Sequence, residues 1–311
     1  MAFLHALGGV FGLMLMGFVG FMLAARNWFG AETRIVLPRL ITQIALPPFL
    51  MYTIMHSFHR NELLMLAKGA LLPLGSVVLT FVLGVILAKV AHVKRQHFGL
   101  FCASVSNSNT VFVGIPVNLA LFGETSVPYV LLYYAASTVF FWTVGQYSIT
   151  CDITDNTCCI PLRTRLLQVF SPPLMGFLAG VGLTLLGVEL PEFLQTVARS
   201  LGNLTTPLAM IFIGITIHDM GLRSIRISKD MTLLILGRMV LGPLVMCGFL
   251  YFFPVPALMG KVFIIQASLP VMAQAAILSA HYHTDPEFGA QAVCLSTLLS
   301  MLTIPLHMVI F

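Results

Sequence analysis

The chain has 311 residues, of which 58% are hydrophobic and only 9% are charged. A soluble globular protein carries about 25% charged residues, so this composition excludes a soluble domain and indicates an all-α protein embedded in a lipid bilayer. The formal net charge of +5 does not indicate nucleic-acid binding, because the basic residues stand in short loops between apolar runs.

Ten apolar runs follow one another along the chain, and each has about the 20 residues that a membrane-spanning helix needs. The first begins near the N-terminus, where the residues MAFLHALGGV lack the basic region of a cleavable signal peptide. The longest connection, from Thr150 to Arg165, leaves no room for a soluble domain. The predicted spans cover approximately residues 4–25, 35–56, 63–88, 98–122, 126–149, 166–187, 193–217, 230–253, 257–280 and 287–310.

Lysine and arginine concentrate in the loops after spans 1, 3, 5 and 7. The loops on the other side are sparse in basic residues: Arg60, Lys68, Arg199 and Lys261. Positive residues favour the cytoplasmic side of a membrane. The pattern therefore predicts a multi-pass protein of the inner (plasma) membrane with both termini outside.

The two halves of the chain resemble each other. PRLITQIALP (38–47) aligns with ARSLGNLTTP (198–207), and KGALLP (68–73) aligns with RMVLGP (238–243). Spans 1–5 would then repeat as spans 6–10. Because five is odd, the second copy enters the membrane inverted, and inverted repeats are typical of secondary transporters.

Two spans are interrupted by proline among small and polar residues. Span 4 contains SNSNTVFVGIP (106–116), and span 9 contains QASLPVMAQAA (266–276). Interrupted spans at equivalent places in two inverted halves indicate a transporter binding site. We expect the half-helices to cross at Pro116 and Pro270. The alternative is that these prolines are only structural, since proline and glycine are common in transmembrane helices.

The crossing would favour an anion. Helix N-terminal ends expose backbone N–H groups and a partial positive charge, which attract a carboxylate. Polar side chains beside the breaks add neutral donors. On span 4 these are Asn107, Asn109 and Thr110, and on span 9 they are Gln266 and Gln274.

NTVFVGIPV (109–117) resembles the span-4 signature of the auxin efflux carrier family. RLITQIALPPFL (39–50), ASLPVMAQAAILSAHY (267–282) and AQAVCLSTLLSMLTIPL (290–306) resemble its spans 2, 9 and 10. The resemblance covers nearly the whole chain, which lacks the long central loop of many plant members. It therefore looks like a compact bacterial-type organic-anion permease.

This resemblance implies a scaffold of spans 1, 2, 6 and 7 and a mobile transport domain that slides against it as an elevator. It implies that Asn109, Gly114 and Pro116 belong to the span-4 motif, that Pro270 marks the span-9 crossing, and that homodimers form through scaffold helices 2 and 7. Asn107 is added from spacing alone. The expected divisions are scaffold 1–60 and 166–220, transport domain 61–150 and 221–311, and cytoplasmic loop 151–165.

Acidic residues all fall at span ends or in loops, which argues against Na+ coupling through a buried carboxylate. Uniport driven by the membrane potential, a Na+ site built from hydroxyls or carbonyls, and proton coupling through a histidine stay open. The eleven residues are Glu32, Glu62, Glu124, Asp152, Asp155, Glu189, Glu192, Asp219, Asp230, Asp285 and Glu287.

Four basic residues are matched in the repeat. Lys68 and Arg238 begin the apolar parts of spans 3 and 8, either as cations that mimic coupling ions or as snorkelling anchors, and we favour snorkelling. Arg39 and Arg199 lie in scaffold spans and could attract anions to a cavity.

Histidine clusters at His56 and His59, and at His281, His283 and Asp285, lie where spans 2 and 9 leave the membrane, and do not make a convincing metal site. No nucleophile–base pair or metal cluster stands at one depth, as an enzyme would need. We therefore expect no enzyme and no cofactor.

The sequence predicts a secondary transporter for a small organic carboxylate, of the malonate, malate or aromatic carboxylate type. The alternatives are a Na+- or H+-coupled symporter of bile-acid type and, from a different class, a membrane receptor.

Overall fold

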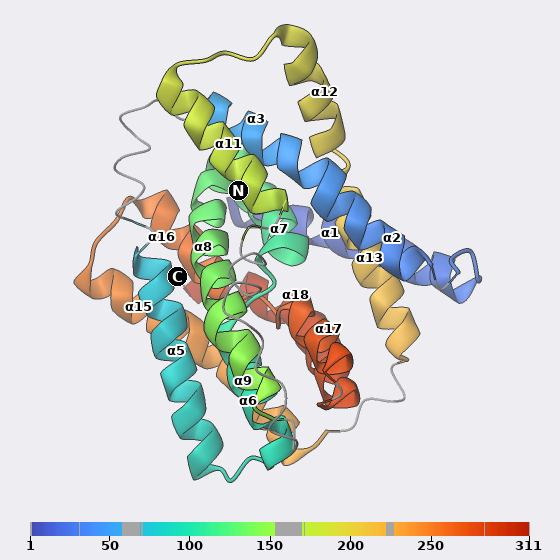
Figure 1. Ribbon diagram of the computed structural model, residues 1–311, viewed down its shortest axis with the longest axis vertical. Helices are drawn as coiled ribbons and strands as arrows, with labels where there is room; N and C mark the ends of the chain where they lie inside the picture. The colour runs from blue at the N-terminus through green and yellow to red at the C-terminus, as the bar shows by residue number, and fades with distance from the viewer. Residues whose placement is uncertain are drawn as a thin grey trace. The chain divides into compact units, whose positions relative to one another are not determined.

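The computed structural model describes residues 2–30, 32–57, 69, 71–152, 170, 172–221, 227–282 and 284–310. Lys68, His59, His283 and most of the loop predicted at 151–165 lie outside these residues. Within the described part, the regular elements are helices, joined at one place by an isolated antiparallel bridge between Ser108 and Val271 (Figure 1).

Six helical segments are long and apolar enough to cross a membrane, which makes the chain a multi-pass membrane protein. They are Ile35–His56, Leu71–Val90, Glu124–Thr150, Glu192–Asp219, Lys229–Phe252 and Pro286–His307. Shorter apolar helices are Phe11–Ala25, Thr110–Phe122, Pro172–Leu186 and Ala257–Ala267. The count of ten spans and the inverted repeat stay predictions.

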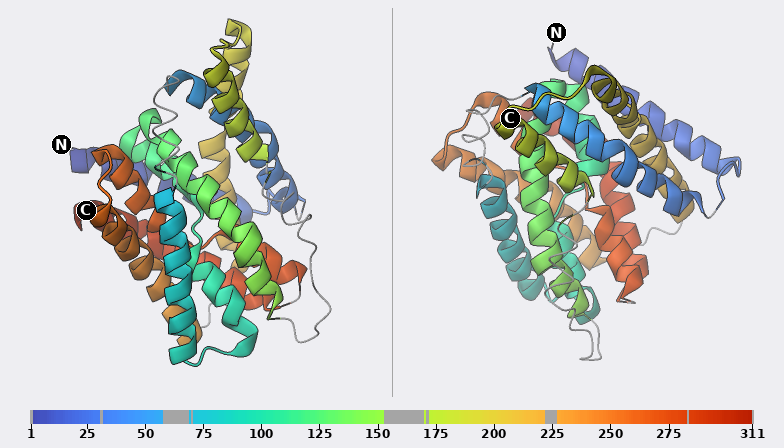
Figure 2. Two further views of the ribbon diagram at one scale, coloured as in Figure 1. Left: turned by 60° about the vertical axis from the view of Figure 1, so that its left-hand side comes forward. Right: turned by 45° about the horizontal axis from the view of Figure 1, so that its top comes forward.

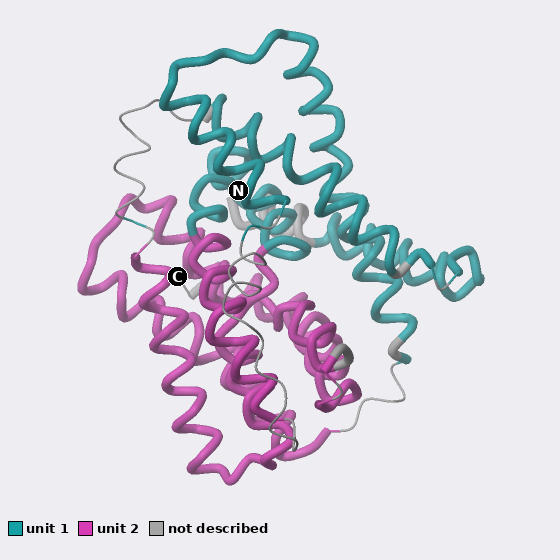
Figure 3. Tube along the Cα trace, viewed as in Figure 1, with its two compact units in different colours: residues 1–69, 111–132, 170–221 teal, residues 70–110, 133–169, 222–311 magenta. Residues whose placement is uncertain are grey.

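The chain divides into two compact units (Figure 3). Unit 1 comprises Met1–Gly69, Val111–Leu132 and Phe170–Gly221, and unit 2 comprises Ala70–Thr110, Tyr133–Val169 and Leu222–Phe311. Residues 111–132, which the sequence analysis assigns to the transport domain, group with unit 1. The functional division into scaffold and transport domain stays a prediction.

Unit 1 is built by close helix packing. Its elements are α1 (Ala2–Ala25), α2 (Thr33–Arg39), η1 (Leu40–Ala45), α3 (Leu46–Ser57), α7 (Ile115–Phe122), η4 (Glu124–Ser126), the start of α8 (Val127–Phe140), α11 (Pro172–Leu186), α12 (Glu192–Gly202) and α13 (Thr205–Met220). Glycines let backbones meet: a Cβ on Gly214 of α13 would collide with the carbonyl of Gly17 on α1. Small residues serve this purpose at helix interfaces in membranes.

Unit 2 contains the rest of α8. The π-helical turn η3 (Thr110–Gly114) begins at Thr110, the last residue of this segment of unit 2. The other elements of unit 2 are α5 (Leu71–Val90), η2 (Arg95–His97), α6 (Phe98–Ser106), η5 (Phe141–Gly145), α9 (Gln146–Thr150), α14 (Lys229–Leu236), η7 (Gly237–Leu241), α15 (Gly242–Phe252), α16 (Ala257–Ala267), α17 (Ala273–His281) and α18 (Pro286–Ile310). Helix α6 packs against both α5 and α9 (Figure 2).

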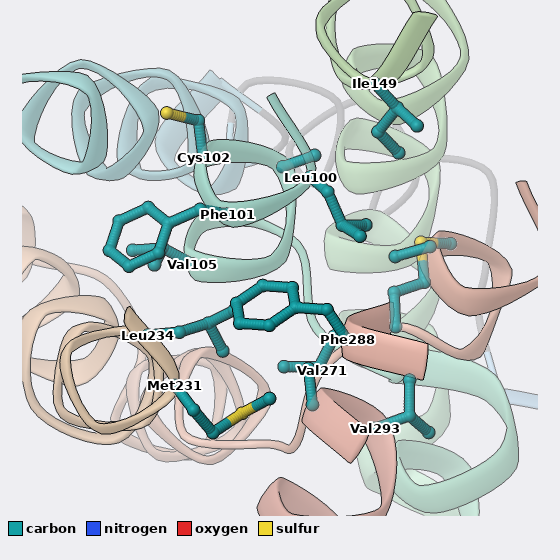
Figure 4. Close-up of a cluster of buried hydrophobic side chains, with 14 of the residues drawn as sticks. Leu100, Phe101, Cys102, Val105, Ile149, Met231, Leu234, Val271, Phe288 and Val293 are labelled. Carbon is teal, nitrogen blue, oxygen red and sulfur yellow. The ribbon is translucent and has the colours of Figure 1, made fainter. Parts of the chain in front are cut away.

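The core of unit 2 is a cluster of buried apolar side chains from α6, α14, α17 and α18. The side chains of Leu234, Val271 and Phe288 point toward one another in this cluster (Figure 4). Because Val271 belongs to the break in span 9, the apolar core of unit 2 packs directly against that break.

A polar cluster closes one end of unit 2. His97 is 6% exposed, and its two ring nitrogens lie 2.8 Å from Asp230 Oδ2 and 2.9 Å from Asp285 Oδ2. The ring stacks on Phe288 at a centroid distance of 4.1 Å. Each ring nitrogen thus lies within hydrogen-bond distance of a carboxylate. The cluster ties the start of α6 to the starts of α14 and α18.

Asp152 caps the N-terminus of α6. Its carboxylate accepts the backbone N–H groups of Gly99 (2.7 Å) and Leu100 (2.9 Å). A carboxylate is stabilised at a helix N-terminus, but burial is the larger influence and raises the pKa of Asp152 to about 6. The described acidic residues of unit 2 that are buried thus lie at helix ends.

Candidate functional site

Two helices of unit 2 break at the same place and are joined there. Helix α6 ends at Ser106 and α16 ends at Ala267. Asn107 then adopts an extended conformation, and Ser108 forms the antiparallel bridge with Val271. The N–H of Asn109 donates to the carbonyl of Pro270 (2.9 Å), and the N–H of Met272 donates to the carbonyl of Asn107 (3.2 Å). The two breaks therefore satisfy each other's backbone groups away from water.

The position of this crossing corrects one expectation. Pro270 lies in it, as predicted, but Pro116 does not mark the break in span 4. Pro116 lies just after the π-helical turn η3, within the continuous helical segment Thr110–Phe122, so the chain stays helical across it. The break falls at Asn107–Asn109, since asparagine favours non-helical backbone by bonding to it locally. Gly114 and Pro116 belong to unit 1.

Asn107 is fully buried and its amide is engaged within unit 2. Its Nδ2 donates to the carbonyl of Ala103 (3.1 Å) and to Ser106 Oγ (2.8 Å). Its Oδ1 accepts from Ser137 Oγ (3.4 Å). These contacts finish the C-terminal end of α6, so Asn107 holds the shape of the crossing and has no amide hydrogen left for a ligand.

Two other predicted residues, Gln266 and Thr110, have polar side-chain atoms without a hydrogen-bond partner among the described residues. Gln266 is fully buried, and neither polar atom of its amide has a hydrogen-bond partner among the residues that the structure describes. The hydroxyl of Thr110 is also buried without a partner. Asn109 is 4% exposed, and Gln274 lies half-buried in the first turn of α17. Buried polar atoms without partners are rare in proteins, so Gln266 and Thr110 mark places where a ligand or water completes the bonding.

The sequence analysis missed several residues of this region. Ser104 and Thr138 carry buried, unpartnered hydroxyls, Ser296 Oγ accepts the N–H of Val271 (3.0 Å), and Tyr133 is fully buried. Serine and threonine within apolar helices are common, and only the fold shows that Ser296 bonds to the break at Val271.

Arg238 corrects a second expectation. Its side chain is fully buried and donates to carbonyls on both sides of the crossing, so it does not snorkel. A basic residue near the start of an apolar run can snorkel or be buried, and Arg238, which stands in the π-helical turn η7, is buried. Arg39 and Arg199 are exposed residues of unit 1.

A family model described as membrane transport protein matches residues 5–151 and 156–308. The chain belongs to this membrane transport family, which is of the auxin efflux carrier type. Membership confirms the resemblance seen in the sequence and makes the chain a transport protein and not an enzyme.

This transporter also matches a curated relative along its whole length. The relative is an uncharacterized transporter of Methanothermobacter thermautotrophicus, 26% identical over 317 aligned positions that cover 100% of both chains. The match supports transport as the activity and says nothing of the substrate.

Proposed function

We propose that this transporter is a secondary carrier that moves a small organic carboxylate anion across the cytoplasmic membrane by alternating access. The observation that carries the proposal is the crossing of two broken helices, joined by the Ser108–Val271 bridge, inside a lipid-embedded bundle. Irregular backbone at membrane depth is tolerated where it is buried in protein or lines a cavity, and transporters bind substrates at such breaks.

Electrostatics favours an anion at this crossing. The first turn of α17 follows it, and a helix start presents free N–H groups and a partial positive charge. Gln266 and Thr110 supply neutral hydrogen-bond capacity, and Arg238 supplies a full positive charge. Among the described residues of unit 2, the buried carboxylate of Asp152 caps the start of α6, and that of Asp230 accepts from the N–H of Lys94 and contacts His97.

The wider proposal has unit 1 as scaffold and unit 2 as the mobile part, with the termini outside the plasma membrane by the distribution of basic loops. It also has a homodimer through the helices of spans 2 and 7. Malonate, malate and aromatic monocarboxylates are the candidate substrates, because each presents a carboxylate to the crossing.

Counterflow in proteoliposomes tests the carrier. Vesicles loaded with unlabelled acid should accumulate the labelled acid when they contain the protein, and protein-free vesicles should not. Malonate, malate and indole-3-acetate serve as probes. Binding of an acid without exchange would indicate a receptor, and exchange that requires a Na+ gradient would indicate the symporter of bile-acid type.

Matched variants locate the site. Gln266→Leu and Thr110→Val remove buried polar groups that make no hydrogen bond to the described residues, so we expect at least a tenfold loss of counterflow with little change in folding. Thr196→Val on the exposed face of α12 is the control and should leave counterflow unchanged. Equal activity of all three variants would remove the crossing from the substrate path.

A further inference from the structure

Arg238 binds the ends of both broken helices at once. Its Nε donates to the carbonyl of Leu269 (2.9 Å), its Nη1 donates to the carbonyl of Val105 (2.8 Å), and its Nη2 donates to the carbonyl of Ala267. The planar fork of a guanidinium can hold three acceptors in this way, whereas an ammonium is a point charge. One side chain thus links α14–α15 to the two halves of the crossing.

Two of the three carbonyls, those of Val105 and Ala267, stand at the C-terminal ends of the broken helices, and the third, that of Leu269, belongs to the break itself. The last carbonyls of a helix have no partner within it and carry its partial negative charge. Near the end of α6, the carbonyl of Ala103 accepts from Asn107, and near the end of α16 the carbonyls of Ile264 and Ile265 accept from Ser268. The carbonyls of Val105 and Ala267 are met by Arg238. Two negative helix ends therefore converge on one cation.

Glycines allow the approach of the arginine. A Cβ on Gly242 would lie 2.7 Å from the carbonyl oxygen of Ala267 and 3.2 Å from Arg238 Nη2. A Cβ on Gly237 would lie 3.1 Å from Cγ2 of Val105. The residues on both sides of η7 are thus small where the broken helices come closest, and the π-helical turn between them presents the guanidinium.

The charge of Arg238 has no carboxylate partner among its described contacts. Its other contact is the buried phenol of Tyr133. A charged side chain inside a membrane protein is expensive and functional as a rule. In ion-coupled carriers, unwound carbonyls and the C-terminal ends of half-helices coordinate the coupling cation. Here the same kinds of backbone carbonyl are present, and they accept hydrogen bonds from the guanidinium of Arg238.

We propose that the ends of α6 and α16 form a monovalent-cation site that the chain fills permanently with its own Arg238 guanidinium. Resting on the proposed function, this means that the carrier has a built-in counter-charge beside its anion site and requires no Na+. The substrate anion then meets a positive site in every cycle without the binding of a second solute.

Melting temperatures of the purified full chain test the site without any substrate. Wild type, Arg238→Ala and the control Arg95→Ala are compared in choline chloride, in sodium chloride and with millimolar guanidinium chloride. Arg95 is an exposed arginine of the same unit. We expect wild type and Arg95→Ala to melt alike in all three. Arg238→Ala should melt about 5 °C or more lower in choline and should regain at least half of that loss with guanidinium, and less with Na+.

Two outcomes would overturn the proposal: a wild type that Na+ stabilises relative to choline, or a folded Arg238→Ala that no cation stabilises. If Arg238→Ala is not recovered as folded protein, Arg238→Lys and Arg238→Met decide. The charged variant should then be recovered in at least fivefold greater yield than the neutral one of similar length, and equal yields would count against a cation site.

Transport separates this inference from the proposed function. Wild-type counterflow of labelled malonate, malate or indole-3-acetate should keep its rate when choline replaces Na+. A rate that falls tenfold without Na+ would overturn the built-in cation and leave the carrier standing. No counterflow of any of these acids, together with guanidinium rescue of Arg238→Ala, would count against the proposed function and leave the cation site standing.

Discussion

The backbone N–H of Asn109 donates to the carbonyl oxygen of Pro270 at 2.9 Å. This bond joins the breaks of two helices from opposite halves of the chain. Proline at this position cannot donate to a helix, but its carbonyl is a full acceptor, and Asn109 uses it. The crossing is thus held by backbone hydrogen bonds between the two breaks.

Asn109→Ala should reduce counterflow at least tenfold in protein that still folds. Alanine keeps the N–H that bonds to Pro270 and removes only the side-chain amide beside the proposed anion. Counterflow and a thermal melt on the same preparation check the prediction. Full activity in well-folded protein would take Asn109 out of the site.

Asn107→Ala should act in the opposite way, mainly on stability. It removes the side-chain hydrogen bonds that Asn107 makes with the carbonyl of Ala103 and with the hydroxyls of Ser106 and Ser137, all in a buried region. Each lost buried hydrogen bond costs about 1 kcal/mol or more, so we expect a loss of about 2–4 kcal/mol in the free energy of unfolding. A melting temperature equal to that of wild type would contradict this role.

Gly242→Ala should destabilise the protein by about 1–3 kcal/mol, because the added methyl group meets the carbonyl of Ala267 at 2.7 Å and overpacking has costs of this size. Gly248→Ala is the matched control. Gly248 lies in the same helix and has no heavy atom within 4 Å of the position of the new methyl group, so its melting temperature should stay level or rise. Equal effects of the two variants would show that the approach to Ala267 is not tight.

His97→Gln should cost about 1–3 kcal/mol of stability, the order expected when buried hydrogen-bonding groups lose a partner. Asp230 and Asp285 would then face each other across a neutral side chain. Arg95→Gln, an exposed neighbour, is the control and should change little. Restoration of stability by the double variant His97→Gln, Asp285→Asn would support repulsion between the carboxylates as the cause, whereas a further loss would argue against it.

Asp152 should make stability fall as the pH rises. Its pKa is about 6 in the folded chain and 3.8 in its ordinary state, so the unfolded chain loses its proton first as the pH increases from about 4 to 6. The contribution of this carboxyl to stability therefore decreases across that window, by about 3 kcal/mol at about 1.4 kcal/mol per pKa unit. Asp152→Asn does not titrate, so the melting temperature of wild type minus that of the variant should be larger at pH 4 than at pH 7. A constant difference would contradict the raised pKa.

The sequence by itself determined that this protein is embedded in a membrane, that its apolar runs are helices, and that spans 4 and 9 are interrupted. These features depend on composition and on local residues, because the cost of charge in lipid and the missing N–H of proline act wherever the residue stands. Pro270 was located correctly for this reason, and the motifs around it were enough to indicate the family.

Only the tertiary structure decided which residues meet. Pro116 and Asn107–Asn109 were both plausible breaks in span 4, and the backbone bonds to Pro270 and Met272 selected the asparagines. Arg238 could snorkel or turn inward, and His97, Asp230 and Asp285 are far apart in the chain. Each of these outcomes depends on a partner supplied by a distant segment, since a buried polar group is stable only where another part of the fold completes its hydrogen bonds.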